Sequence, residues 1–236
     1  MFTWGGIHIK VFCLGYAGSS KTVFRDWIKK IHDIEFIPLE YKGRGTRLNE
    51  FNYANFNEAI DDICRIIKKD QGNSPYAIFG HSMGGYIAYE LFYKLSKCNI
   101  QLPKHLFLSG INPPMLRKET NISHLDDDRF LEEVIKLGGI SKTLLSHRDI
   151  LNVFLPTLKN DFRIVEEYKY EDKKQKIDCN MTIFLGTEDT LTQENNRVWS
   201  DLCKKDIEFY KLTGNHFFLH KKTKTLQDII IHNIYL

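Results

Sequence analysis

A serine between two glycines is the first feature of the sequence that could do chemistry. Residues 80–84 read GHSMG, which is the pattern G-x-S-x-G. A short apolar run precedes them, and a segment with helical spacing follows from about residue 84 to 95. In that context the pattern predicts a sharp strand-to-helix turn that presents the hydroxyl of Ser82 above a sheet. The alternative interpretation is a glycine-rich turn with a capping serine.

A serine hydroxyl needs a base to activate it, and the base needs an acid to orient it. His216 lies just after an apolar run at 207–212, and Asp189 lies just after another at 181–185. The chain order serine, acid, histidine is the one that this type of elbow uses. The sequence therefore predicts a catalytic triad of Ser82, Asp189 and His216.

Two other carboxylates and eight other histidines have to be weighed against this choice. Glu188 is the neighbour of Asp189, and Asp161 also precedes the histidine, so both stay alternatives for the acid. His81 adjoins the serine, but we expect its side chain to point away. Of the nine histidines, His216 alone combines the chain order with a position after a strand.

The tetrahedral intermediate of an acyl transfer also needs hydrogen-bond donors for its oxyanion. The backbone N–H of Met83 is one candidate, because it follows the nucleophile. The loop after the first predicted strand supplies the second, and there we select Ala17; the alternative is a structural loop. This reaction requires no metal and no cofactor, since the base and the acid generate the nucleophile.

Strand-like and helix-like segments alternate along the chain, which predicts an α/β fold with a mostly parallel central sheet and helices on both faces. All 236 residues are expected to form one domain. The predicted strands cover residues 7–14, 34–39, 75–79, 105–108, 181–185 and 207–212. The predicted helices cover residues 23–31, 56–67, 84–95, 195–203 and 223–234.

The stretch from about 113 to 162 breaks this alternation, because it contains amphipathic helices and no strand-like run. A long insertion at this point is typical of a lid over an active site, and the alternative is that it covers one edge of the core. If it is a lid, its apolar side chains line the substrate cavity. The candidates are Phe130, Val134, Leu151 and Phe154.

Composition excludes several other classes of protein. The net charge is only +3, and lysines are interleaved with acids, so a nucleic-acid-binding face is not indicated. The five cysteines form no C-x-x-C pair, which argues against a zinc site and favours free thiols in a reducing cytoplasm. The N-terminal residues lack the features of a secretory signal, and no apolar run is long enough for a membrane span.

Taken together, five segments make the chain resemble the type II thioesterases that accompany nonribosomal peptide and polyketide synthases. The elbow at residues 80–85 and the loop at 214–218 match that family's nucleophile and histidine segments. The other segments are residues 15–18, 41–47 and the lid region at 127–139 and 155–161. The chain departs from the family pattern at Gly15 and Lys42, where proline is usual, and at Ser19, where a second glycine is usual.

The resemblance implies an α/β-hydrolase fold and an editing reaction. Such an enzyme removes wrong or stalled acyl groups from the phosphopantetheine arm of a carrier domain, which is typically acidic and would suit a mildly basic, monomeric partner. A general carboxylesterase and a medium-chain fatty acyl thioesterase are the alternative enzymes. A protein that binds carrier domains without turnover is the alternative from another class.

Overall fold

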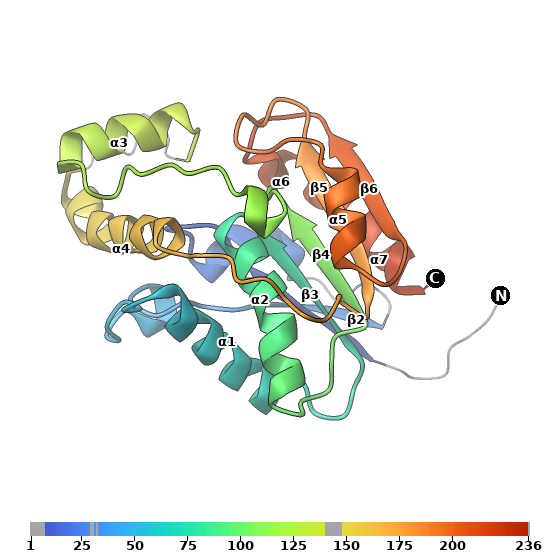
Figure 1. The fold of residues 1–236 in the computed structure, drawn as a ribbon. Helices are drawn as coiled ribbons and strands as arrows, with labels where there is room; N and C mark the ends of the chain where they lie inside the picture. Colours follow the sequence, from blue (N-terminus) through green and yellow to red (C-terminus); the bar gives the residue numbers. More distant parts are fainter. Residues whose placement is uncertain (1–7, 29–30, 32, 140–147, 236) are drawn as a thin grey trace.

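A six-stranded parallel sheet forms the centre of the molecule (Figure 1). The computed structural model describes residues 8–28, 31, 33–139 and 148–235. The strands are β1 (Ile9–Leu14), β2 (Ile34–Pro38), β3 (Tyr76–His81), β4 (His105–Ser109), β5 (Asn180–Gly186) and β6 (Ile207–Leu212). They lie in the order β2-β1-β3-β4-β5-β6, and every neighbouring pair is parallel. The predicted fold class is confirmed.

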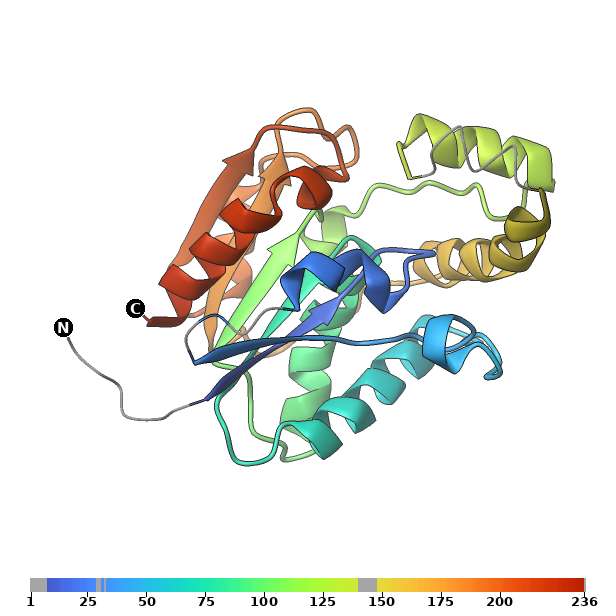
Figure 2. The ribbon, with the colours of Figure 1, turned by 180° about the vertical axis from the view of Figure 1, so that it is seen from behind.

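Helices cover both faces of this sheet, as its all-parallel pairing requires (Figures 1 and 2). One face packs against α1 (Phe56–Asp70), α2 (Met83–Lys97) and α5 (Asn196–Leu202). The other face packs against the 3₁₀ helix η1 (Lys21–Trp27), α6 (Phe218–Lys221) and α7 (Thr223–Tyr235). Strand side chains alternate between the two cores: Phe12 enters the first and Val11 the second. The sheet is therefore buried on both sides.

The helices of the predicted insertion lie together beyond the carboxyl ends of the strands (Figure 1). They are the short η3 (Pro114–Leu116), α3 (Asp127–Lys136) and α4 (Arg148–Glu166). The described residues between 113 and 162 contain no strand, and α3 and α4 share a separate apolar cluster. Residues 140–147, which the prediction included, lie outside the described residues. This arrangement positions α4 above the strand ends where the site is expected.

The helix predicted at residues 23–31 is present over Lys21–Trp27 as the 3₁₀ helix η1, and residues 29 and 30 of the prediction lie outside the described residues. Ser20 caps its first turn by accepting from the N–H of Thr22. Phe24 departs from helical dihedral angles, and Phe24 and Trp27 are its buried residues. A spacing of three residues matches a 3₁₀ turn as well as an α-helix, so the apolar pattern could not distinguish them. The short helix α6 was not predicted.

The cysteines are all free, and the helices can be compared with the length and apolar character of a membrane span. All five cysteines are free thiols, and four of them are buried while Cys98 is exposed. Burial raises the pKa of the Cys13 thiol, which keeps it protonated and unreactive. No helix in the described part of the chain has both the length and the apolar character that a membrane span demands.

Candidate active site

Ser82 lies at the junction where β3 passes directly into α2. Its dihedral angles are φ 55° and ψ −118°, a region that residues other than glycine rarely adopt. The surrounding hydrogen bonds fix this conformation, because the N–H of Ser82 donates to the carbonyl of Ser109 on β4 at 2.8 Å. The strained backbone holds the serine hydroxyl at the carboxyl edge of the sheet, as an elbow requires.

The two glycines of the elbow allow the close packing of this turn. A Cβ on Gly80 would lie 2.2 Å from the carbonyl oxygen of Gly84, and one on Gly84 would lie 2.4 Å from that of Leu14. The N–H of Gly84 also donates to the carbonyl of Gly15 at 3.0 Å. Any side chain at either position would therefore push the elbow away from β1 or open the turn itself.

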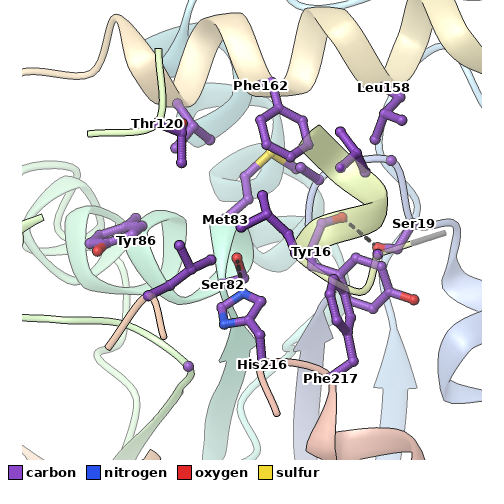
Figure 3. Close-up of a pocket in the computed structure, with 18 of the residues that line it drawn as sticks. Tyr16, Ser19, Ser82, Met83, Tyr86, Thr120, Leu158, Phe162, His216 and Phe217 are labelled. Carbon is purple, nitrogen blue, oxygen red and sulfur yellow. Dashed lines mark hydrogen bonds between the residues drawn. The ribbon is translucent and has the colours of Figure 1, made fainter. Parts of the chain in front are cut away.

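Three side chains that the sequence analysis selected lie in one hydrogen-bonded row. His216 Nε2 is 2.9 Å from the Oγ of Ser82 (Figure 3), and His216 Nδ1 is 2.8 Å from Oδ2 of Asp189. They come from the ends of β3, β5 and β6, where catalytic groups of parallel sheets gather. Because Nδ1–H donates to the carboxylate, Nε2 is left to accept the serine proton. This row can pass a proton from the hydroxyl to the imidazole.

The Asp189 carboxylate is held in its charged form. Burial alone would raise its pKa, but the hydrogen bond and charge of His216 and the N–H of Leu191, 2.9 Å away, lower it below its ordinary value. The neighbouring Glu188 is exposed. Asp161 lies elsewhere, where its carboxylate accepts from Arg44 and from the N–H of Gly18. Of the three candidate acids, Asp189 alone contacts the histidine.

His81 turns away from the serine, as expected. Its ring is fully buried, and its Nδ1 lies 2.8 Å from the Oγ of Ser109. Burial sets the pKa of His81 well below its ordinary value, so the ring is neutral near pH 7. Its centroid is 5.2 Å from that of the His216 ring. A neutral ring at this position packs near the His216 ring without placing a second positive charge beside it.

The loop that follows β1 lies beside the nucleophile. Ala17 and Met83, the two residues selected for their backbone N–H groups, both line the same cavity as Ser82. Ser19 closes this loop by donating from both its N–H and its Oγ to the carbonyl of Tyr16, at 3.0 and 2.7 Å (Figure 3). The departure from the family's second glycine thus adds a hydrogen bond that shapes the turn.

A cavity of about 310 Å³ opens above Ser82 and His216. Two of the four predicted lid residues, Val134 and Phe154, line it. Phe130 and Leu151 do not; they are buried in the cluster between α3 and α4. An amphipathic helix has a wide apolar face, and only part of that face reaches the cavity while the rest packs on the partner helix.

Other lining residues were missed by the sequence analysis. They include Tyr16, Leu137, Leu158, Phe162 and Phe217. Leu158 and Phe162 lie four residues apart on α4, so helical spacing from Phe154 could have identified them. Phe217 follows His216 directly, and its ring packs on that of Tyr16 with centroids 4.9 Å apart. Only the folded loop reveals that last contact.

A buried ion pair ties α4 to the loop beside the nucleophile. Arg44 donates to both carboxylate oxygens of Asp161, with 2.7 Å between Nη2 and Oδ1, and Asp161 is completely buried. Oδ2 of the same carboxylate accepts from the N–H of Gly18 at 2.7 Å. Sequence analysis did not predict this pair, although both residues fall in segments quoted for the resemblance. The carboxylate connects three separate segments at the cavity wall.

Comparison with known proteins agrees with this geometry. The family described as "Thioesterase domain" matches residues 9–234. The linear gramicidin dehydrogenase LgrE of Brevibacillus parabrevis is 32% identical over 94% of this chain and 86% of its own. The medium-chain S-acyl fatty acid synthase thioesterase of Rattus norvegicus is 30% identical, over 90% of this chain and 82% of its own.

A solved structure shows the same similarity. The crystal structure of ClbQ, from the colibactin nonribosomal peptide and polyketide pathway, superposes with a TM-score of 0.91 at 30% identity and covers 97% of both chains. LgrE carries the name of a redox enzyme, whereas the matching family and the rat relative are thioesterases. The hydrogen-bonded row of Ser82, His216 and Asp189 is an arrangement for acyl transfer, in agreement with the thioesterases.

Proposed function

The chain belongs to the thioesterase domain family and is a thioester hydrolase, and from that premise we propose its substrate and the residues that act on it. The substrate is an acyl group held as a thioester on the phosphopantetheine arm of a carrier domain in nonribosomal peptide or polyketide synthesis. The reaction removes groups that are wrong or stalled. The observation that carries the proposal is the contact between Ser82 and His216 inside a cavity with an apolar wall.

The proposed reaction has two steps. Ser82 Oγ attacks the thioester carbonyl while His216 Nε2 takes its proton, and Asp189 stabilises the imidazolium that forms. The N–H groups of Ala17 and Met83 donate to the oxyanion. The C–S bond then breaks, the thiol leaves with the proton from His216, and an ester on Ser82 remains. Water, activated by the same imidazole, hydrolyses this ester and releases the acid.

Features of the whole molecule support the remaining parts of the proposal. α3 and α4 act as a lid insertion of a single domain, because their apolar residues wall the cavity. The net charge of +3 suits an acidic partner such as a carrier domain, and the interleaving of lysines with acids in the sequence argues against a nucleic acid. Free thiols agree with a reducing cytoplasm, and the chain acts there as a monomer.

The test compares the hydrolysis of an acyl-pantetheine and of an acyl-loaded carrier domain by the wild type and by Ser82→Ala. Loss of the nucleophile should lower kcat by about 10⁴- to 10⁶-fold. Ser200→Ala, at an exposed position on α5, is the matched control and should keep the wild-type rate. Equal turnover by the wild type and Ser82→Ala would refute the assigned nucleophile.

A second candidate function is release of medium-chain fatty acids, which the similarity to the rat fatty acid synthase thioesterase favours. One carrier domain loaded with a series of acyl groups separates the two functions. Editing predicts similar release rates for short acyl and aminoacyl groups, whereas the second function predicts a maximum at medium chain length. A matched pair of oxygen ester and thioester tests the remaining alternative, a general carboxylesterase, which would hydrolyse the ester at least as fast.

A further inference from the structure

The cavity lining contains basic side chains but no acidic ones, among the described residues. Arg117 and Lys118 supply its positive charge. The rest of the wall is apolar or neutral, apart from His216 of the site itself. A cavity built only for an acyl chain gains nothing from two cations, because burying apolar surface is what such a chain offers. The cations therefore indicate a second, anionic part of the ligand.

Arg117 and Lys118 lie beside the loop that follows β5 and carries Asp189, called the acid loop below. Lys118 Nζ donates to the carbonyl of Thr190, next to Asp189, at 3.1 Å, and Arg117 Nη2 donates to the carbonyl of Glu166 at 3.2 Å. Lys118 is exposed while Arg117 is half-buried, so the pair runs from the surface inward. Thr192, from the same acid loop, also lines the cavity.

The apolar wall lies on the other side of the nucleophile. A Cβ added to Gly18 would lie 2.4 Å from Leu158 and 2.9 Å from Phe154, so these lid residues contact the loop beside β1. Figure 3 shows Thr120 on one side of Ser82 and Leu158 on the other. The serine hydroxyl thus separates an apolar end from a cationic end. A thioester has the same division, since its acyl group and its thiol arm leave the carbonyl in different directions.

Neither cation forms a salt bridge with a carboxylate of the described residues. Arg117 and Lys118 donate to backbone carbonyls instead. The carboxylate of Glu166 accepts from the hydroxyl of Thr120 at 2.9 Å and from the N–H of Ile122 at 2.7 Å, and that of Asp189 lies against His216. An arginine also has five N–H donors, so one bond to a carbonyl leaves most of its fork for an anion.

We infer that Arg117 and Lys118 form an anion-binding end of the cavity that takes the phosphate of the pantetheine arm. The inference rests on the proposed function, because it assumes a thioester on such an arm. The arm enters between the acid loop and the end of α4, its phosphate stays at the outer cations, and its thioester reaches Ser82. The acyl group then extends toward Val134, Phe154 and Leu158. The cations select the substrate by its arm and leave the acyl end unselective.

The test uses one acyl group on two arms: S-butyryl-pantetheine, which is uncharged, and S-butyryl-4′-phosphopantetheine. The wild type should hydrolyse the phosphorylated substrate with a KM about tenfold lower, since each cation adds a partly exposed ionic contact. In Arg117→Gln/Lys118→Gln the ratio of the two KM values should fall to about one, whatever the change in the rate on the uncharged substrate. Raising the salt concentration should weaken the wild-type preference as well.

Lys204→Gln is the matched control, because Lys204 is exposed, pairs with Asp178 and precedes the amino end of β6, the opposite edge of the sheet. It should keep the full preference. A wild type that hydrolyses both substrates with equal KM would overturn the inference while leaving the proposed function intact. Failure to hydrolyse either one would instead contradict the proposed function.

A second arm of the experiment separates the phosphate from a carboxylate within the acyl group. S-succinyl-pantetheine and S-butyryl-pantetheine differ by a terminal acid and carry no phosphate. The inference expects the wild type and the double variant to treat this pair alike. A succinyl preference that the double variant loses, with no effect of the phosphate, would reassign the cations to the acyl end and overturn the inference.

Discussion

Two buried carboxylates, Asp189 and Asp161, each pair with a basic side chain, and these two partners differ. Asp189 pairs with His216, an imidazole that can accept a proton and return it during a reaction, and His216 lines the cavity. Asp161 pairs with Arg44, which is always charged, and is completely buried on α4. The first pair can change its charge during a reaction. The guanidinium of the second keeps its charge throughout.

The difference in partners separates a chemical role from a positional one. In the pair of Asp189 and His216, one imidazole ring lies between the carboxylate and the hydroxyl of Ser82, so it can accept the hydroxyl proton. The Asp161 carboxylate instead joins α4, the Arg44 loop and the N–H of Gly18, so it fixes α4 against the loop that follows β1. Loss of the first pair should therefore change rate with little effect on folding, and loss of the second should change stability first.

The largest effect is expected for the first pair, Asp189 and His216. In Asp189→Asn the amide would donate to Nδ1 of His216, which forces the proton onto Nε2 and removes the acceptor for the serine hydroxyl. We expect kcat to fall by about 10³- to 10⁴-fold, as in other serine triads with the wrong tautomer. Steady-state hydrolysis of an acyl-pantetheine measures the change. A fall of less than tenfold would mean that Asp189 does not orient the base.

The next largest effect is expected for the second pair, Asp161 and Arg44. Asp161→Asn keeps an oxygen for the N–H of Gly18 but leaves the Arg44 guanidinium buried beside a neutral group. Breaking a buried ion pair in this way costs about 3–5 kcal/mol, so the urea midpoint should fall markedly while the remaining folded enzyme still turns over. Urea unfolding followed by far-UV circular dichroism measures the change in the free energy of unfolding.

A double variant distinguishes the stranded charge from a packing defect. Arg44→Met/Asp161→Asn removes the guanidinium while retaining the oxygen near Gly18, so it should be more stable than Asp161→Asn alone. If the double variant is instead less stable than the single one, the cost comes from lost packing and hydrogen bonds of Arg44, and the positional interpretation of the charge pair fails.

The sequence predicted the first pair and missed the second for a physical reason. The nucleophile, acid and histidine each follow a strand, and parallel strands end at one edge, so topology alone brings Ser82, Asp189 and His216 together. Asp161 and Arg44 lie 117 residues apart on a helix and a loop. No periodicity relates these two elements, and their contact depends on how the lid packs. Asp161 could therefore be weighed as a rival acid but not assigned to Arg44.

The same reasoning explains which elements could be predicted. All six strands were recognisable as short apolar runs between loops. The inner strands β3 and β4 are buried at every residue because both faces of the sheet are covered, whereas the edge strand β6 has no fully buried residue. The type of helix η1 could not be predicted, since its two buried aromatic residues are compatible with a 3₁₀ helix and with an α-helix. Within the lid, amphipathic spacing identified α3 and α4 but could not tell cavity-facing Phe154 from Phe130, which faces the neighbouring helix.

The smallest expected effect is a pH dependence that isolates the charge of Asp189. Its pKa is lowered in the folded chain, so its carboxylate stabilises the fold above the ordinary value of about 4. That contribution is lost as the pH falls through the lowered pKa, because the unfolded chain binds the proton more tightly. Asparagine has no such proton, and all other acids are common to both proteins. The stability gap between the wild type and Asp189→Asn, measured by urea midpoints, should therefore narrow from pH 7 to pH 3. A stability gap that stays constant over this range would show that Asp189 stabilises the fold by its shape and hydrogen bonds. The difference between its pair with His216 and the pair of Asp161 with Arg44 would then apply to catalysis alone.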